Sequence, residues 1–228
     1  MAIAGTALII GASRGIGLEL CKQYLAQGWR VFGTHRSEQD RIVLRDMGAQ
    51  TLRLDVHDTN DVAGLAWQLD GENIDLIVMN AGVYGPRDSN LLSPPAPEDF
   101  AAVMNTNVLG TLRLLPVVAP LLFKSAGTLA FVSSRMGSIT DSTASYGALY
   151  RISKAAVNMV ARMAHGEFGP QGVRVLSLHP GWVRTDMGGP NANVSPADSV
   201  AGLRTVIADK ERFAAGGFYD YKGERLAW

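Results

Sequence analysis

The stretch Gly11-Ala12-Ser13-Arg14-Gly15-Ile16-Gly17 decides the fold of this 228-residue chain. An apolar run precedes it, and a segment of helical period follows it. Glycines at such a strand-to-helix turn let the backbone approach a pyrophosphate, whose charge the helix N-terminus stabilises. Turns of this kind also occur without a ligand. The stretch therefore predicts a nucleotide-binding α/β unit that the rest of the chain has to support.

Short apolar runs alternate with longer segments of helical period along the whole chain, which predicts a mainly parallel sheet covered by helices on both faces. The expected strands are residues 6–11, 30–34, 51–55, 74–80, 128–133, 173–179 and 217–220. The expected helices are residues 15–27, 41–47, 58–69, 98–124 and 148–168, and one that Ser195 caps. We expect one doubly wound, Rossmann-type domain over residues 1–228 with a seven-stranded sheet.

Composition excludes several classes of function. Lysine plus arginine and aspartate plus glutamate number 21 each, so no net charge favours nucleic acid or an anionic membrane. The longest late apolar run, residues 114–123, contains two prolines and is too short to span a bilayer. The single Cys21 and four scattered histidines show no metal-ligand spacing. We expect a cytoplasmic protein without a metal that acts on a small molecule.

Two segments interrupt the alternation, residues 84–97 with four prolines and residues 183–195, rich in Gly, Asn and Pro. Both are predicted loops that follow the carboxyl end of a strand, where ligands of doubly wound sheets bind. We expect the second, extended to about residue 197, to form a short substrate lid.

Tyr150 and Lys154 lie four residues apart in an expected helix, and therefore on one face. An ammonium about 4 Å from a phenol, at an effective dielectric of about 20, lowers the phenol pKa by about 3 units. The pair is a candidate acid–base catalyst with a lowered tyrosine pKa. Taken alone, such a pair is more often an ordinary contact on a solvated helix.

Further motifs occur in a fixed order between residues 5 and 186. Together with the glycine turn they are Asp55, Asn80-Ala81-Gly82, Asn107, Ser133-Ser134, Tyr150 with Lys154, and Pro180-Gly181. This set resembles the short-chain dehydrogenase/reductase family, in particular its small sniffer-type carbonyl reductases and C-factor-like proteins. Met79 departs from the family's usual asparagine. The resemblance implies an oxidoreductase that transfers hydride between a nicotinamide and a carbonyl or secondary alcohol.

The resemblance also implies roles for the catalytic residues. Tyr150 would exchange a proton with the substrate oxygen, and Lys154 would lower its pKa and hold the nicotinamide ribose. Ser134 would bind the substrate oxygen, and Asn107 a water in the proton relay. Ser138 competes with Ser134 because the stretch before the tyrosine is long; the strand-ending double serine favours Ser134.

The cofactor site implied by the resemblance joins several segments. Asp55 would contact the adenine, or else cap the turn after its strand, while residues 180–185 would close over the nicotinamide. The expected cofactor residues are Gly11, Ser13, Arg14, Gly15, Ile16, Gly17, Arg36, Asp55, Val56, Asn80, Ala81, Gly82, Tyr150, Lys154, Pro180, Gly181, Val183 and Thr185.

The charge at the end of the second strand predicts the coenzyme. A carboxylate there would bind the adenine ribose of NAD and repel the extra phosphate of NADP. The chain has His35 and Arg36 instead, and the nearest acid, Glu38, falls in the next helix. Because arginine binds phosphate through several donors, Arg14 and Arg36 favour NADP(H), with NAD(H) as the second choice.

Two questions stay open at the level of sequence. The first is turnover: a C-factor-like signalling or redox-sensing protein with little or no turnover is the alternative, although retention of Ser134, Tyr150 and Lys154 favours an enzyme. The second is assembly, for which we expect a homodimer, with a tetramer as the alternative, through the two long helices. The apolar residues expected at that interface are Val103, Leu112, Ala155, Val157 and Met159.

Overall fold

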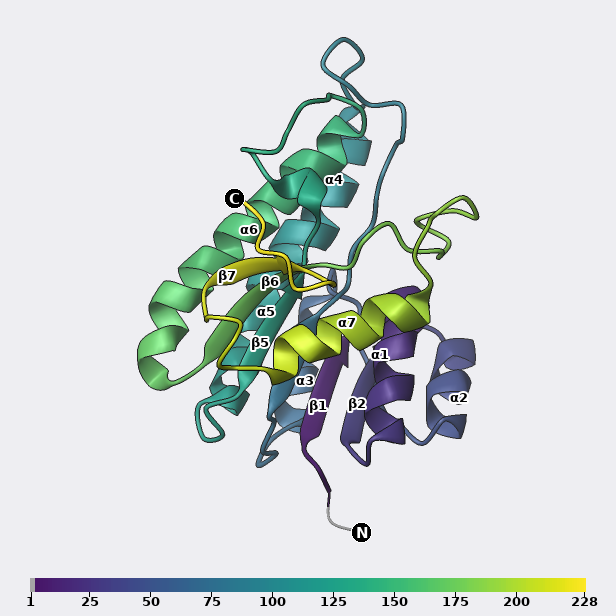
Figure 1. Ribbon diagram of the computed structural model, residues 1–228. Helices are drawn as coiled ribbons and strands as arrows, with labels where there is room; N and C mark the ends of the chain where they lie inside the picture. The colour runs from purple at the N-terminus through teal and green to yellow at the C-terminus, as the bar shows by residue number, and fades with distance from the viewer. Residues whose placement is uncertain (1–2) are drawn as a thin grey trace.

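The computed structural model describes residues 3–228, in which seven parallel strands form one sheet in the order β3-β2-β1-β4-β5-β6-β7 (Figure 1). The strands are β1 (Thr6–Ile10), β2 (Arg30–His35), β3 (Gln50–Arg53), β4 (Leu76–Met79), β5 (Thr128–Val132), β6 (Arg174–His179) and β7 (Gly217–Asp220). The predicted Rossmann-type fold is confirmed. Residues 1 and 2 of the predicted domain lie outside the described residues.

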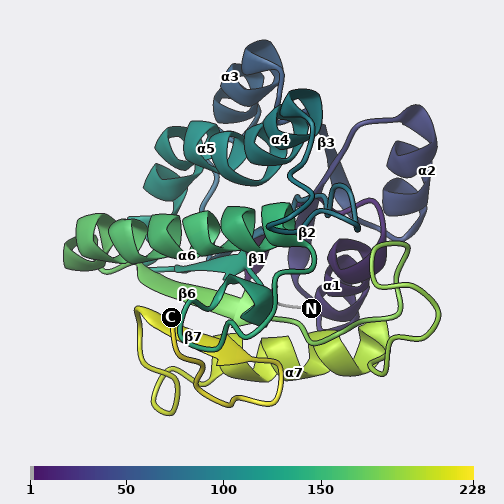
Figure 2. The same ribbon diagram turned by 90° about the horizontal axis from the view of Figure 1, so that it is seen from above.

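Helices cover both faces of this sheet (Figure 2). They are α1 (Gly15–Ala26), α2 (Glu38–Asp46), α3 (Thr59–Gln68), α4 (Pro97–Met104), α5 (Gly110–Val118), α6 (Ala148–Phe168) and α7 (Pro196–Ala208), with short helical turns η1 (Asn105–Leu109), η2 (Ala119–Leu122), η3 (Arg135–Gly137) and η4 (Gly169–Gln171). Helix α2 begins three residues earlier than predicted because the Ser37 hydroxyl accepts from the Asp40 N–H and caps it. Ser195 caps α7 in the same way, as expected.

The core has two halves, one on each face of the sheet. Leu8 and Ile77 pack with α3, α5 and α6 on one face, whereas their neighbours Ile9 and Val78 pack with α1 and α7 on the other. Alternate strand residues point to opposite faces, so continuous apolar strands require cover on both.

The predicted helix 98–124 is interrupted. After α4, the turn η1 is a π-helix in which the Gly110 N–H donates to the Asn105 carbonyl five residues before it. The whole stretch Pro97–Leu122 is 26 residues long, and by length and hydropathy alone it could cross a membrane. The apolar segment is therefore longer than the ten residues on which the sequence-based exclusion of a membrane span rested. Leu114 and Val118 of this stretch are buried in the core of the fold.

Helices α5 and α6 cover the same face of the sheet (Figure 2), and each carries exposed apolar side chains. Leu112 is 41% exposed and Met159 is 61% exposed, as a dimer surface requires. Val103 and Val157 are buried, so their assignment to that surface was wrong. Val157 packs in the core over the sheet, and Val103 packs against Gly85 of the loop after β4.

Strand β1 lies between β2 and β4, and the chain reverses its direction of winding there. The crevice of such a sheet opens at the carboxyl ends of these strands. The segments that follow β4, β5 and β6 leave the sheet at the same edge (Figure 1). The lid between β6 and α7 is tied at both ends by a bridge between Val183 and Val194.

Candidate active site

The turn between β1 and α1 has the geometry that its glycines predict. Gly11 and Gly15 have φ of +81° and +53°, in the left-handed region. A Cβ on Gly11 would lie 2.8 Å from the Ala81 backbone, and one on Gly17 would lie 2.0 Å from the Gly11 carbonyl oxygen. The Asn80 amide donates to that same carbonyl at 2.7 Å. Asn80 and the glycines therefore fix the turn against the end of β4.

Helix α1 leaves its positive end available to a ligand. No side chain caps it, and no acidic residue lies in its first turn. Anions bind at such helix N-termini because unpaired N–H groups and the helix dipole both attract negative charge. The turn and the helix therefore fit a pyrophosphate group.

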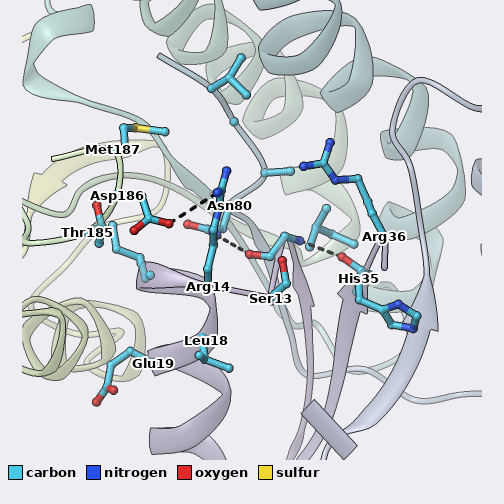
Figure 3. A pocket seen from close by; sticks show the side chains of 18 of the residues that line it. Ser13, Arg14, Leu18, Glu19, His35, Arg36, Asn80, Thr185, Asp186 and Met187 are labelled. Carbon is cyan, nitrogen blue, oxygen red and sulfur yellow. Dashed lines mark hydrogen bonds and ion pairs between the residues drawn. The ribbon is translucent and has the colours of Figure 1, made fainter. Parts of the chain in front are cut away.

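A cavity of about 630 Å³ opens in front of this turn (Figure 3). Of the expected cofactor residues, it is lined by Gly11, Ser13, Arg14, Gly15, Ile16, Arg36, Asp55, Val56, Asn80, Ala81, Gly82 and Thr185. Gly17 packs beneath the turn instead of lining the cavity, and Tyr150, Lys154, Pro180, Gly181 and Val183 do not line it either. A volume of this size is typical of a small-molecule or cofactor site.

Gly82 separates this cavity from Lys154. A Cβ at Gly82 would lie 3.5 Å from the Lys154 Nζ and 3.3 Å from the Asn107 Oδ1. Because Gly82 has no side chain, Lys154 and Asn107 border the cavity at this point. The cavity and the Tyr150 region are thus adjacent parts of one site.

Positive charge gathers at the second-strand end of the cavity. Arg36 is exposed there, and within residues 3–228 no carboxylate lies within ion-pair distance of it. Glu38 is turned away from it toward Arg41 of its own helix. Arg14 differs, since its guanidinium pairs with Asp186 of the lid at 3.5 Å (Figure 3). The sequence did not indicate this pairing.

Asp55 caps the turn after its strand, which was the alternative role predicted from the sequence. Its Oδ1 accepts from the His57 N–H at 3.0 Å, while its own N–H donates to Asp61. The carboxylate therefore caps the turn after β3 and also lines the cavity. Lys22 and Glu19 of α1 line it too, which the sequence analysis missed because neither belongs to a motif.

Ser134 and Tyr150 come together beyond the end of β5. Ser134 caps η3, where its hydroxyl accepts from the Met136 N–H, and its side chain also interacts with Tyr150. Ser138 is occupied elsewhere: its hydroxyl donates to the Trp228 carbonyl and accepts from the Asp141 N–H. Gly137 lets the turn η3 pack closely against α6, because a Cβ there would lie 2.6 Å from the backbone of Lys154. The geometry therefore favours Ser134 over Ser138.

The electrostatics of Tyr150 and Lys154 differ from the expectation. Burial raises the pKa of Tyr150 above its ordinary value; Tyr84 adds to this, and the interaction with Ser134 opposes it. Burial lowers the pKa of Lys154 to about 8. The predicted lowering of the tyrosine pKa by lysine was wrong for this structure. The Lys154 ammonium donates to the Val132 carbonyl and lies 5.6 Å from the Tyr150 ring centroid, so desolvation dominates.

Asn107 lies in the π-helical turn η1 and ties the segment after β4 to α6. Its Oδ1 accepts from the Val83 N–H at 2.8 Å, and its Nδ2 donates to the Val83 carbonyl and to the Ser153 hydroxyl. Both amide hydrogens are therefore used within the protein. A relay water would have to bind a remaining lone pair of Oδ1 or of the backbone carbonyl, which already accepts from the Thr111 hydroxyl.

Tyr84 is a site residue that the sequence analysis did not find. Its ring stacks on that of Tyr150, with centroids 4.5 Å apart and planes 17° apart. No motif marks Tyr84, and its place shortly after Asn80-Ala81-Gly82 at the end of β4 was the only signal.

Comparison with known proteins places this geometry in a family. The model of the short chain dehydrogenase family matches residues 5–194. The C-signal of Myxococcus xanthus is 39% identical over 156 residues, which are 68% of this chain and 93% of that protein. A Burkholderia multivorans short-chain dehydrogenase/reductase, described as putative and solved with bound NADP, has a TM-score of 0.91 at 32% identity, covering 98% of this chain and 99% of the other.

The carbonyl reductase Sniffer of D. melanogaster has a TM-score of 0.87 at 26% identity and covers all of both chains. The family match spans the glycine turn, Ser134, Tyr150 and Lys154, the residues that the structure brings to one edge of the sheet. The chain belongs to the short-chain dehydrogenase/reductase family and is of the sniffer and C-signal type.

Proposed function

We propose that this oxidoreductase is an NADP(H)-dependent carbonyl reductase, or alcohol dehydrogenase in the reverse direction. One observation carries the proposal: Ser134 interacts with the buried Tyr150 phenol next to a cavity whose far end holds Arg36, which has no ion-pair partner within residues 3–228. The first pair suits a carbonyl oxygen, and the arginine suits a phosphate on the adenosine ribose.

Residues that line the cavity would hold such a coenzyme. The glycine turn and the N-terminus of α1 would bind the pyrophosphate, Arg36 and Arg14 the extra phosphate, and Asp55 and Val56 would border the adenine. When bound, NADPH supplies a hydride for the carbonyl carbon. The NADP in the similar B. multivorans structure supports this choice.

The protein's own residues would supply orientation and a proton. Ser134 would donate a hydrogen bond to the substrate oxygen and hold it beside the Tyr150 hydroxyl. The raised pKa keeps Tyr150 protonated at neutral pH, so its O–H can pass a proton to the oxygen as the carbonyl is reduced. Lys154 would stabilise the phenolate that remains. Its ammonium is held in place by the hydrogen bond that it donates to the Val132 carbonyl. Asn107 would hold the backbone at Val83 in place by accepting a hydrogen bond from the Val83 N–H.

A signalling or sensing role without turnover is the second candidate, and the similarity to the M. xanthus C-signal favours it. A binding protein needs the nucleotide cavity but no proton donor beside it. The two candidates therefore differ in what Tyr150 does. They do not differ in cofactor binding.

The test is NADPH oxidation by the purified protein with a panel of aldehydes, ketones, quinones and acyl-linked ketones, with Tyr150→Phe measured in parallel. Turnover that the substitution abolishes supports the reductase. Tight NADPH binding without turnover on any member of the panel would support the second candidate. The cytoplasmic location and the homodimer remain predictions.

A further inference from the structure

Tyr84 lies in the loop between β4 and α4 and covers one face of the Tyr150 ring. The two rings stack at 4.5 Å with an interplanar angle of 17°. We propose that Tyr84 is a positioning residue, which holds the Tyr150 ring so that its hydroxyl points at Ser134. This inference rests on the proposed role of Tyr150 as the proton donor.

The backbone around Tyr84 is shaped to admit this stack. Gly147, the residue before α6, has φ of +63°, and a Cβ there would lie 2.5 Å from the Tyr84 hydroxyl oxygen. Gly85 has φ of +79°, and a Cβ there would lie 2.5 Å from a methyl group of Val103 in α4. A larger residue at Gly147 would displace the Tyr84 ring, and one at Gly85 would push the loop that carries Tyr84 away from α4. Gly147 thus leaves room for the Tyr84 ring beside the start of α6, and Gly85 lets the loop pack closely against α4.

Arg87 packs against Tyr84. Its guanidinium lies 5.0 Å from the Tyr84 ring centroid. Tyr84 therefore contacts both the Tyr150 ring, on which it stacks, and the Arg87 guanidinium. Arg87 also donates to the backbone carbonyl of Met187 in the lid. A continuous row therefore runs from the lid through Arg87 and Tyr84 to Tyr150.

The row predicts that Tyr84 also shields Tyr150 from water. The groups that face the Tyr150 ring or hydroxyl are Tyr84, Ser134 and Lys154. Those that act on Tyr84 are Arg87, Tyr146 and Arg151. Desolvation is the largest cause of the raised Tyr150 pKa, so removing the Tyr84 ring lets water reach the phenol and lowers that pKa.

The test compares Tyr84→Leu with Tyr84→Phe, which keeps the ring and loses only the hydroxyl. We expect Tyr84→Leu to lower kcat about tenfold, the loss that follows from removing one aromatic pair, without changing the Kd for NADPH. Its Tyr150 should titrate at lower pH in ultraviolet absorbance, read as the difference from the same protein carrying Tyr150→Phe. Tyr84→Phe should keep the wild-type kcat. Tyr146→Leu, which removes a neighbouring exposed ring, should keep the wild-type titration.

Wild-type kcat and wild-type titration in Tyr84→Leu would overturn the inference alone, whereas turnover by Tyr150→Phe would overturn the proposed function. Retained NADPH binding shows that Tyr84→Leu is folded. If it does not bind NADPH, Arg87→Leu replaces it, since Arg87 is exposed. A several-fold lower kcat in that variant supports the row from lid to tyrosine, and an unchanged kcat contradicts it.

Discussion

Replacing Arg36 with alanine should weaken NADPH binding while leaving NADH binding nearly unchanged. Arg36 is exposed at the end of β2 and lines the nucleotide cavity, with no ion-pair partner within residues 3–228. Its guanidinium is therefore available to the extra phosphate without breaking another contact. A charge-assisted hydrogen bond contributes about 1.5–3 kcal/mol. Its loss corresponds to roughly a ten- to hundredfold higher Kd for NADPH.

Arg14 should contribute less than Arg36, because Asp186 already shares its charge. At their separation of 3.5 Å, the two charges attract by about 1.2 kcal/mol in bulk water. Both side chains are mostly exposed, so salt reduces this further, into the range of about 0–1 kcal/mol for surface pairs. Arg14→Ala should therefore cost several-fold less NADPH affinity than Arg36→Ala. Asp186→Asn should tighten NADPH binding by up to about fivefold.

The assay is the Kd of each coenzyme by fluorescence titration, together with the ratio of kcat/KM values for NADPH and NADH. Arg41→Ala is the matched control, since Arg41 pairs with Glu38 in α2 and does not line the cavity. The double variant His35→Asp with Arg36→Ala should reverse the coenzyme preference, because a carboxylate there repels the phosphate and accepts from the free ribose hydroxyls. A wild-type protein that prefers NADH would refute the reasoning.

Three more outcomes follow from the site and the outer helix face. Tyr150→Phe should remove nearly all turnover while keeping the Kd for NADPH within a few-fold, and a variant with a tenth of the wild-type kcat would contradict the assignment of the proton donor. Lys154→Met should abolish turnover yet raise the Tm at neutral pH. In the folded protein the pKa of Lys154 is about 8, below the ordinary value of 10.5, so between these pH values the unfolded chain binds more protons than the folded one. The free energy of unfolding therefore rises with pH across that window. Removing the lysine should therefore stabilise by up to about 3 kcal/mol at pH 7, a gain that calorimetry should find absent near pH 10.5. Met159→Lys combined with Leu112→Lys should convert a dimer to a monomer in light scattering, and wild-type protein that is monomeric at micromolar concentration would exclude the dimer.

Most of the fold could be predicted because its signals are local. Strand β7 and helix α6 have the predicted bounds, since glycines or turns delimit each segment. The helix that was predicted as one, residues 98–124, was the main error. Its apolar period continues through Asn105–Leu109, but the backbone shifts there to i+5 hydrogen bonding. Periodicity reports which face is buried and carries no information on such a local change.

The sequence indicated many of the candidate site residues, but it did not indicate which of them contact one another. Ser134, Tyr150 and the glycine turn were named because they belong to motifs, and their roles stay predictions. The pairs Arg14 with Asp186 and Tyr84 with Tyr150 join segments that are distant in the sequence. Such pairs depend on how the loops after β4 and β6 fold over the sheet, and a single sequence does not contain that information.

The electrostatics of Tyr150 show why spacing alone misjudged the pKa. The i to i+4 argument places the Lys154 ammonium near the phenol, but it treats both groups as if they were at a helix surface. In the fold both are buried, and burial disfavours each charged form: it raises the pKa of Tyr150 and lowers that of Lys154. Each residue is thereby shifted toward its neutral form, the phenol and the amine. A neutral phenol is the form that reduction requires, because it holds the proton until negative charge develops on the substrate oxygen. That charge, and the phenolate left behind, are what the nearby lysine and Ser134 would stabilise, so the pair is suited to act during the reaction and not before it.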